Sequence, residues 1–369
     1  MKILHILPSL KARGAQVFAR DLIDAFAGLQ VVHQSLLVTS NRREQSDVVP
    51  KSLLPEFLSS RTFFGKVLET RKAIQRYGPD IVLAHGGEPF KLAVWACIGL
   101  SGPKVVYRKI GLSAKWLRFP RGIRIIHQRL LLERAYAVLT VGESMRGELE
   151  SLFGFKATNI KTIYQGVDPS DYGVSEGQRS GIRTGLGIPE AGIAIIAVGA
   201  LTWEKNQIVM LRAFKKVLND GHDTYLILVG DGPERTALEA AANELKVSHR
   251  TIFLGIRGDV PRLLSSADIH ILTSLTEGVP GVLIEANMAG IPSVAWDVAG
   301  AHEVIKPGIT GYLTPFEQED EFFFALRSLI KSEENRNAMG MNAKEFAMER
   351  FLFSNCIREH MALFNTMLD

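Results

Sequence analysis

The sequence predicts an α/β protein made of two doubly wound, parallel-sheet domains. Short apolar runs alternate with amphipathic stretches along the 369-residue chain, which is typical of repeated βα units. The runs are almost continuously apolar, as expected for parallel strands that are covered on both faces. The length exceeds that of one typical hydrophobic core, so we expect two domains of similar size.

The first domain is expected to span residues 1–168. The apolar run at residues 3–7 lacks the length and cleavage site of a signal peptide, and we interpret it as a strand. Further strands are expected at residues 34–38, 81–84, 105–107, 138–141 and 160–163. Helical patterns occur at residues 17–26, 63–76 and 130–134.

The alternation breaks once, at residues 169–190, where a polar segment with Gly and Pro and no clear periodicity predicts an interdomain linker. The second domain is expected at residues 191–349. Its strands are expected at residues 193–198, 224–229, 251–254, 269–272, 293–295 and 311–313, with helices at 209–218 and 235–245.

The last amphipathic stretch, residues 346–367, predicts a single helix, and we expect residues from about 350 to 369 to pack back on the first domain. Ligands of doubly wound sheets bind at the carboxyl ends of the strands. Two such domains are therefore expected to face a central cleft.

Composition indicates a soluble protein, because 46% of the residues are hydrophobic and 22% are charged. No apolar run reaches the roughly 18 residues that a membrane span needs. Cys97 and Cys356 lie in apolar helical patterns and are expected to be free thiols. Together these features predict a cytoplasmic protein.

Charge is distributed unevenly along the chain. Residues 1–185 hold 27 Lys and Arg against 15 Asp and Glu, whereas residues 186–369 hold 16 against 24. The net charges are thus +12 and −8. A basic half beside an acidic half predicts an anionic surface or partner for the first half.

The most informative segment is the Gly- and Pro-rich turn between the run at residues 269–272 and a helix expected to start near Gly281. Glu277 lies in the turn and Glu285 in the first turns of the helix. Unpaired backbone N–H groups at such a turn suit a phosphate, whereas carboxylates bind hydroxyl groups. The combination predicts a nucleotide-sugar ligand. The Glu spacing alone would also fit two surface glutamates on an ordinary βα unit.

With these features the chain resembles the family 4 retaining glycosyltransferases of GT-B fold over nearly its whole length, most closely at residues 198–313. The resemblance implies two Rossmann-like domains and a nucleotide-sugar donor. It implies that Glu277 lies beside the donor sugar ring and that Glu285 binds ribose hydroxyls. Backbone amides that would hold the diphosphate or the sugar are those of Gly278, Gly281 and Val282.

A second strand-loop-helix segment, residues 198–206, carries Gly199 and Lys205. By resemblance both contact the donor, and Lys205 pairs with the diphosphate, on which the charge of the leaving group develops. A solvated lysine at a helix start is the alternative. The family commonly has Arg after the glycine, where this chain has Ala200. One charge-assisted contact of about 1.5–3 kcal/mol is then absent or supplied by another cation. The candidates are Arg257, Arg13 and Lys109.

Two further segments of the second domain match the family. Residues 228–234 contain glycines that permit a tight turn, and we interpret them as structural. Residues 253–257 end a strand, and the resemblance implies that the backbone at Ile256 and Arg257 contacts the nucleobase.

The loop at residues 9–16 follows the first strand. The family usually has two glycines here, which let the backbone approach the ligands. Gly14 is retained, and Arg13 replaces the other glycine, either as a phosphate contact or as a solvated loop residue.

His85 follows the strand at residues 81–84 and precedes two glycines. Its position at the carboxyl end of a strand favours a function, and the resemblance implies a hydrogen bond to the donor sugar near the reacting carbon. A hydrogen-bonded structural histidine is the alternative.

Residues 104–134 hold nine Lys and Arg and one Glu, interleaved with apolar side chains. We expect residues 109–121 to form an acceptor-side or membrane-facing loop, and residues 123–132 to form a solvated helix with a buried stripe. This composition suits an anionic membrane surface or a phosphorylated lipid, and no nucleic-acid motif accompanies it. The residues assigned to this side are Arg13, Arg108, Lys109, Lys115, Trp116, Arg118 and Arg121.

The predicted function is retaining transfer of a hexose-type sugar from a UDP- or GDP-linked donor to a saccharide or lipid-linked saccharide. The catalytic candidates are His85, Glu277 and Lys205. The sequence has no cluster of metal ligands and no Asp-x-Asp triplet, so we expect neither a metal nor another cofactor and no nucleic acid partner. Front-face attack by the acceptor is the mechanism that the resemblance implies.

The open alternatives are a nucleotide-sugar 2-epimerase-like isomerase and a non-catalytic nucleotide-sugar-binding subunit. The expected location is the cytoplasm, with peripheral attachment to the inner face of the cell membrane left open.

Overall fold

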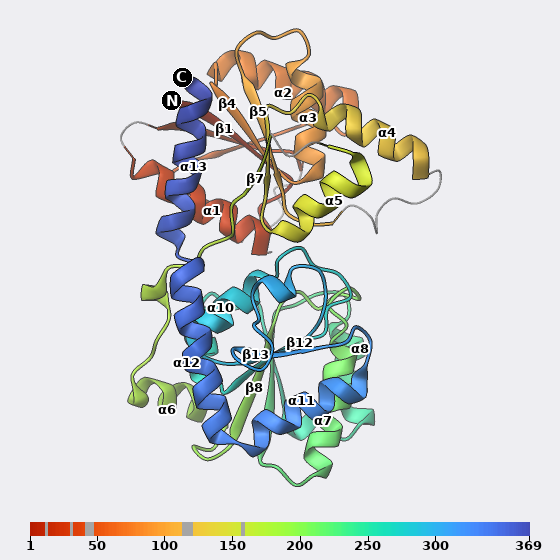
Figure 1. The fold of residues 1–369 in the computed structure, drawn as a ribbon, viewed down its shortest axis with the longest axis vertical. Coiled ribbons are helices and arrows are strands. Elements are labelled where there is room, and N and C mark those ends of the chain that lie inside the picture. The colour runs from red at the N-terminus through yellow and green to blue at the C-terminus, as the bar shows by residue number, and fades with distance from the viewer. Residues whose placement is uncertain (12–13, 30–31, 41–47, 113–120, 156–158) are drawn as a thin grey trace. The chain divides into compact units, whose positions relative to one another are not determined.

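The computed structural model describes residues 1–11, 14–29, 32–40, 48–112, 121–155 and 159–369. The chain divides into two compact units. Unit 1 comprises Met1–Gln165 together with Asn355–Asp369, and unit 2 comprises Gly166–Ser354 (Figure 1).

Unit 1 is built on a seven-stranded sheet with the order β3-β2-β1-β4-β5-β6-β7, in which the paired strands are parallel. The strands are β1 (Lys2–Leu7), β2 (His33–Val38), β3 (Pro55–Phe57), β4 (Ile81–His85), β5 (Lys104–Lys109), β6 (Ala137–Thr140) and β7 (Ile160–Thr162). The helices are α1 (Gly14–Ala27), α2 (Phe63–Tyr77), α3 (Gly87–Cys97), α4 (Arg121–Leu132), α5 (Glu143–Phe153) and most of α13 (Phe353–Leu368).

Unit 2 has a six-stranded sheet with the order β10-β9-β8-β11-β12-β13, also paired in parallel. The strands are β8 (Ile193–Val198), β9 (Thr224–Val229), β10 (Thr251–Gly255), β11 (Ile269–Leu272), β12 (Ser293–Trp296) and β13 (Gly311–Thr314). The helices are α6 (Glu176–Gly185), α7 (Gln207–Asn219), α8 (Arg235–Glu244), α9 (Val260–Ser266), α10 (Gly281–Ala289), α11 (Glu319–Lys331) and α12 (Glu333–Arg350).

Burial of the central strands follows from helices on both faces of each sheet. Every residue of β4 is buried, and so is every residue of β11 and β12. Such strands have no solvent face, which is why they read as continuous apolar runs. The two doubly wound sheets confirm the predicted fold class.

Three features of the fold were not predicted. The short strand β3 has the sequence Pro-Glu-Phe, which carries no strand pattern. The final helix, predicted as one element over residues 346–367, is two helices. They separate at residues 351–352, where the N–H of Val167 donates to the carbonyl of Phe351 and the N–H of Phe353 donates to the carbonyl of Val167. The third feature concerns the predicted linker.

The segment at residues 169–190, predicted as a linker, instead folds as part of unit 2. It contains α6, whose first turn has a capping box between Ser175 and Gln178. Arg179 and Arg183 of α6 lie 2.5 and 3.1 Å from the carboxylate of Asp268. The helix is thus held to the sheet by ion pairs as well as by apolar contacts, and the sequence therefore shows little apolar periodicity.

The C-terminal helix α13 packs on unit 1. The ring of Phe364 meets that of Phe26 on α1 edge to face, with 6.0 Å between centroids, and His360 lies 6.2 Å from the same ring. Both side chains are buried. Within the described ranges, no helix is both long and apolar enough to cross a bilayer.

Replacing Asp268 with Asn should destabilise the protein strongly, because it leaves the buried Arg183 without its counter-charge. Losing one partner of a buried pair costs about 3 kcal/mol, which lowers Tm by roughly 6–12 °C in a domain of this size. Thermal unfolding followed by circular dichroism measures the change. The matched control is Asp320→Asn, because Asp320 pairs with Lys216 at the same 2.5 Å but both side chains are exposed. The free energy of unfolding of that variant should differ from the wild-type value by no more than about 0.5 kcal/mol. Equal shifts for both variants would contradict the expectation.

Candidate functional site

The site in unit 2 is built around an ion pair between Lys205 and Glu277. The Nζ atom of Lys205 lies 2.5 Å from Oε1 of Glu277. Lys205 belongs to the loop between β8 and α7, and Glu277 to the loop between β11 and α10. The lysine side chain is 28% exposed and the glutamate 13%. The structure thus brings together two predicted site residues that are 72 positions apart.

The two loops meet because the strands before them are neighbours. β8 and β11 pair in parallel, so their carboxyl ends lie at the same edge of the sheet. The N–H of Leu275 donates to the carbonyl of Glu204 over 2.7 Å. The hydroxyl of Thr273 donates to the carbonyl of Asn206 over 3.0 Å. These bonds hold the backbone on both sides of the ion pair.

Two glycines shape the backbone around the ion pair. Gly199, directly after β8, has a φ of 156°, a conformation that residues with a side chain rarely adopt. A Cβ at Gly300, where φ is 79°, would lie 2.0 Å from the carbonyl oxygen of Gly278. Any other residue at position 300 would displace the loop that carries Glu277. Gly300 was not predicted from the sequence. The feature of the sequence that could have indicated it is a glycine in the loop that follows the apolar run of β12.

Helix α10 begins at Gly281, as predicted, and Pro280 before it provides no side-chain cap. The N–H of Leu283 donates to the carbonyl of Pro280. The amides of Gly281 and Val282 belong to the first turn, where backbone N–H groups have no partner within the helix. Glu285 lies one turn further along, half-buried and engaged in contacts of its own. The turn therefore offers donors for an anion four residues after Glu277, the partner of Lys205.

Ser274 is a residue of this turn that sequence reasoning missed. It lies two residues after the end of β11, and its hydroxyl is buried with no hydrogen-bond partner among the described residues. An unsatisfied buried hydroxyl costs about 1–3 kcal/mol. Its position between β11 and Glu277 makes it a candidate ligand contact.

The other predicted donor residues of unit 2 lie at the ends of β8 and β10. Ile256 is 62% exposed, directly after Gly255. Arg257 forms two hydrogen bonds of 2.8 Å to Asp259, which raises the pKa of the guanidinium. Arg257 is thus already paired with a carboxylate. The carbonyl of Ala200 accepts a hydrogen bond of 2.9 Å from Gln207.

His85 lies in the interior of unit 1, and its hydrogen bonds define its tautomer. The amide nitrogen of Gln34 donates to the carbonyl of Ile23, so Oε1 of Gln34 faces Nε2 of His5 and accepts its proton over 2.9 Å. Nδ1 of His5 must then accept from Nε2 of His85 over 3.2 Å. His85 therefore carries its proton on Nε2 and presents Nδ1 as an acceptor. That atom is buried with no partner in the described part of the chain.

The charge state of the imidazoles supports this assignment. Burial lowers the pKa of His85 well below its usual range, and the nearby His5 and Arg108 lower it further. Burial lowers the pKa of His5 to about 4. Both rings are neutral near pH 7. With an exposed fraction of 2%, His85 occupies the core rather than the surface. Its contact with a donor sugar stays a prediction.

The prediction that Arg108 and Lys109 belong to a membrane-facing loop is wrong, whereas their contact with an acceptor stays a prediction. Their exposed fractions are 2% and 1%. The guanidinium of Arg108 lies over the ring of Phe18, 4.2 Å from its centroid. Lys109 pairs with Glu148 over 2.8 Å and donates to the carbonyl of Gly111 over 2.7 Å. Both cations stand at the end of β5, which lies between β4 and β6, so their side chains enter the core.

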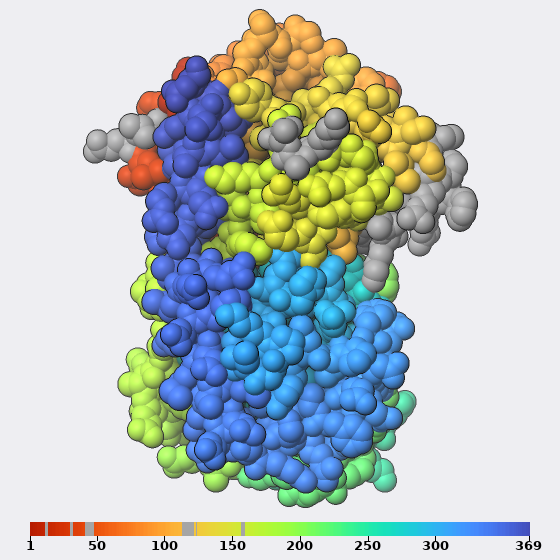
Figure 2. Space-filling model, viewed as in Figure 1, coloured from red at the N-terminus to blue at the C-terminus, as the bar shows by residue number. Residues whose placement is uncertain are grey.

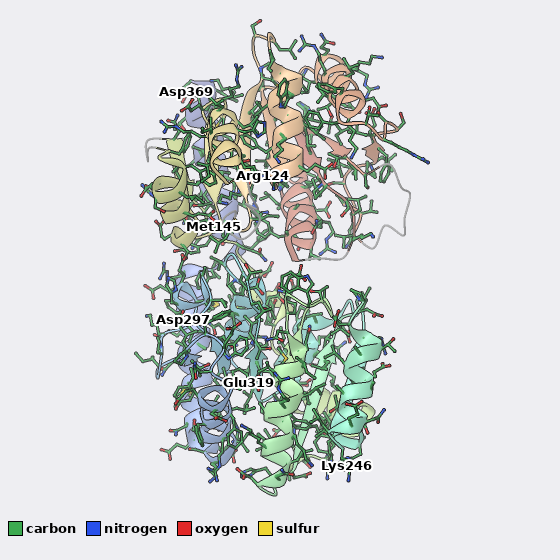
Figure 3. All side chains as sticks on the ribbon, turned by 90° about the vertical axis from the view of Figure 1, so that its right-hand side faces the viewer. Arg124, Met145, Lys246, Asp297, Glu319 and Asp369 are labelled. Atoms are coloured by element: carbon green, nitrogen blue, oxygen red, sulfur yellow. The ribbon has the colours of Figure 1, made fainter. Side chains whose placement is uncertain are left out.

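The remaining predicted residues are only partly placed. Gly14 is the first residue of α1, and a Cβ at this position would meet no other described residue within 4 Å, its chain neighbours and its own helix backbone aside. Arg121 is the first residue of α4, on which Arg124 is exposed (Figure 3). The predicted residues outside the described ranges are Arg13, Lys115, Trp116 and Arg118.

Among the described residues, no group of three or more His, Cys, Asp or Glu side chains is arranged to hold a metal ion. Both cysteines are free thiols, as predicted. The fold and the site define a two-domain α/β protein in which a Lys–Glu ion pair joins two strand-to-helix loops of the second unit.

Comparison with known families gives this class a name. The family model described as Glycosyltransferase Family 4 matches residues 12–171, and the model for glycosyl transferases group 1 matches residues 178–346. The chain belongs to the group 1 glycosyltransferases of the family 4 type, and its two Rossmann-like units form the GT-B fold.

Individual relatives agree with this assignment. An uncharacterised glycosyltransferase of Methanocaldococcus jannaschii is 28% identical over 63% of this chain and 60% of its own length. The N-acetyl-alpha-D-glucosaminyl L-malate synthase of Bacillus anthracis is 28% identical over 65% of this chain and 62% of its own. The chain thus matches about three fifths of these curated relatives. The crystal structure of Anabaena HepE in complex with UDP and glucose superposes with a TM-score of 0.85 at 22% identity, covering 99% of this chain and 100% of that chain.

The buried histidines predict that stability falls on acidification. An unfolded imidazole takes up a proton near pH 6.5, whereas burial lowers the pKa of His5 and of His360 to about 4. Between these values the unfolded state binds more protons. The free energy of unfolding is therefore highest above pH 6.5 and falls by about 2 kcal/mol per imidazole between pH 7 and pH 5. Urea unfolding at the two pH values measures the loss.

The control for this prediction compares two His→Asn variants. His360→Asn should make the pH dependence smaller, whereas His249→Asn, which changes an exposed ring, should leave it unchanged. Equal slopes for the wild type and His360→Asn would contradict the expectation.

Proposed function

We propose that this protein is a retaining glycosyltransferase that moves a hexose-type sugar from a UDP- or GDP-linked donor to a saccharide or lipid-linked saccharide. The observation that carries the proposal is the Lys205–Glu277 ion pair beside the uncapped start of α10. It joins a cation and backbone donors, which suit a diphosphate, to carboxylates, which suit sugar hydroxyls.

Lys205 would stabilise the leaving diphosphate. Negative charge develops on that group as the glycosidic bond breaks, and a preorganised cation with helix-start amides stabilises it in a site that excludes water. In the free protein Glu277 balances the charge of Lys205. When a donor binds, the lysine would turn to the diphosphate and the Glu277 carboxylate would accept from a sugar hydroxyl. Glu285, one turn along α10 from Gly281, would bind the ribose hydroxyls.

Retention at the anomeric carbon would follow from front-face attack. The acceptor hydroxyl would approach on the side that the diphosphate leaves, and a phosphate oxygen would take its proton. Lys205 and the α10 amides supply the positive charge that this step needs, so we propose that no metal is required. Ser274, buried beside Glu277, would donate to a ligand oxygen.

The donor and the acceptor are proposed on different grounds. HepE, whose structure contains UDP and glucose, supports a UDP-sugar as the first donor to test. For the acceptor, unit 1 holds 26 Lys and Arg against 14 Asp and Glu, a net charge of +12. This charge favours a phosphorylated, lipid-linked acceptor at the cytoplasmic face of a membrane.

One observation favours a second candidate, a non-catalytic subunit that binds nucleotide-sugars. Ala200 stands where the family commonly has Arg, and Arg257, a replacement, is held by Asp259. A missing phosphate contact would weaken donor binding and could leave the fold with a binding role alone.

Lys205→Ala and Glu277→Ala should each lower kcat/KM for glycosyl transfer by about 100-fold or more, the scale of one preorganised charge contact. Because the two side chains act as a pair, the double variant should lose much less than the product of the single effects. Steady-state kinetics with a UDP-sugar measure the losses. Lys216→Ala, which removes an exposed lysine paired with Asp320 on the same unit, is the control. Near-wild-type kinetics for both single variants would reject this site.

A thermal-shift panel of UDP-, GDP-, ADP- and dTDP-sugars, with and without Mg²⁺, should show one metal-independent shift of several degrees. A ligand at about 100 times its Kd stabilises by about 2.7 kcal/mol.

NMR of the product should show a retained anomeric configuration, and an inverted product would reject the mechanism. Sugar isomerised without an acceptor would indicate an epimerase. Donor binding without turnover on any acceptor would indicate the binding subunit.

A further inference from the structure

Unit 1 exposes a group of large apolar side chains on α2 and α3, here named the α2–α3 patch. Its members are Phe63, Phe64, Leu68, Trp95 and Ile98, with exposed fractions of 41%, 73%, 60%, 40% and 42%. This part of the chain forms the orange surface of Figure 2. Single exposed apolar residues are ordinary, whereas a contiguous group marks an interaction surface.

Ring contacts and hydrogen bonds show that the patch is contiguous. The ring of Phe63 packs edge to face on Phe64 and on Trp95, with centroid distances of 5.7 and 6.4 Å. Arg71, one turn after Leu68 on α2, donates to the carbonyl of Ile98 over 2.7 Å. The end of α3 is thus tied to α2 beside the exposed side chains.

The charges around the patch are mainly positive. Phe64, Leu68, Arg71 and Lys72 follow one another along the outward face of α2, which is described over its full length. The acidic residues of the two helices are already engaged, because the carboxylate of Glu69 accepts from the N–H and hydroxyl groups of a serine before α2 and Glu88 of α3 pairs with Lys66 over 3.0 Å. The aromatic end therefore adjoins a basic end on one helix.

We propose that the α2–α3 patch docks unit 1 on an anionic phospholipid surface, with Phe64, Leu68 and Trp95 entering the interface and Lys72 reaching the headgroup phosphates. Aromatic side chains and long cations side by side are what interfacial binding uses. Phe64 protrudes at 73% exposure rather than lining a groove, which suits a deformable bilayer better than a protein pocket. The surface differs from the segment at residues 109–121. It involves no residue of the Lys205–Glu277 site, so binding is testable without a donor or an acceptor.

The experiment is co-sedimentation of the full chain with vesicles of phosphatidylcholine, alone or mixed with phosphatidylglycerol. The wild type should bind the mixed vesicles, and salt should weaken binding. Phe64→Ser/Leu68→Ser should bind at least about tenfold more weakly, because two apolar side chains no longer enter the interface. Lys72→Ser should weaken binding about fivefold. The matched control is Phe324→Ser, which removes an aromatic side chain that is 54% exposed on α11 of unit 2 and should bind like the wild type.

A measurement on Trp95 keeps the test independent of variant stability. Brominated lipids in the mixed vesicles should quench tryptophan fluorescence of the wild type, and Trp95→Phe should remove most of that quenching. The proposal would be overturned if the wild-type protein does not co-sediment with vesicles that contain phosphatidylglycerol. Equal binding of Phe64→Ser/Leu68→Ser and Phe324→Ser would also overturn it. A dimer in light scattering that Phe64→Ser/Leu68→Ser abolishes would instead assign the patch to a second copy of the chain.

Discussion

The parallel pairing of β8 with β11 is the constraint on which the unit 2 site depends. It places two loops at one sheet edge, where a backbone hydrogen bond from Leu275 and a bond from the Thr273 hydroxyl hold them together without help from the charged side chains. The backbone of these loops therefore does not depend on the Lys205–Glu277 ion pair. A site supported by a rigid backbone in this way loses little binding energy to reorganisation.

The fold class could be predicted from the sequence because both sheets are covered on two faces. The strands therefore consist of short, almost continuous apolar runs. The sequence also predicted that Lys205 and Glu277 stand in loops that follow such runs, and the structure brings the two side chains together, whereas their contact with a ligand stays a prediction. The sequence was insufficient where polar contacts determine the structure. Helix α6 is held by Asp268 as well as by apolar contacts, and Gly300 matters only because a loop far away in the sequence passes it. Both contacts join residues that are far apart in the sequence, so no local sequence pattern predicts them.

Arg108 and Lys109 are a second case in which the local sequence pattern did not predict the environment of the side chains. A run of basic residues in a sequence is ordinarily a solvated surface, and here two of its members enter the core. Lys109 is compensated by Glu148, whereas Arg108 has the face of Phe18 and no ion pair within the described residues. Burial lowers the pKa of Arg108 to about 10, so it stays charged near neutral pH. The interior of unit 1 thus keeps a positive charge beside neutral imidazoles, and a negatively charged or lone-pair-bearing group would be favoured there.

The path of the chain has a consequence for the order in which the protein folds. Unit 2 is one continuous segment, whereas unit 1 needs its last fifteen residues, Asn355–Asp369, to bury Phe26 beneath Phe364. During synthesis the first sheet emerges long before the helix that completes its core. Unit 2 can finish folding while unit 1 still exposes apolar surface, and unit 1 closes only after α13 has left the ribosome. The domain made first is therefore the domain completed last.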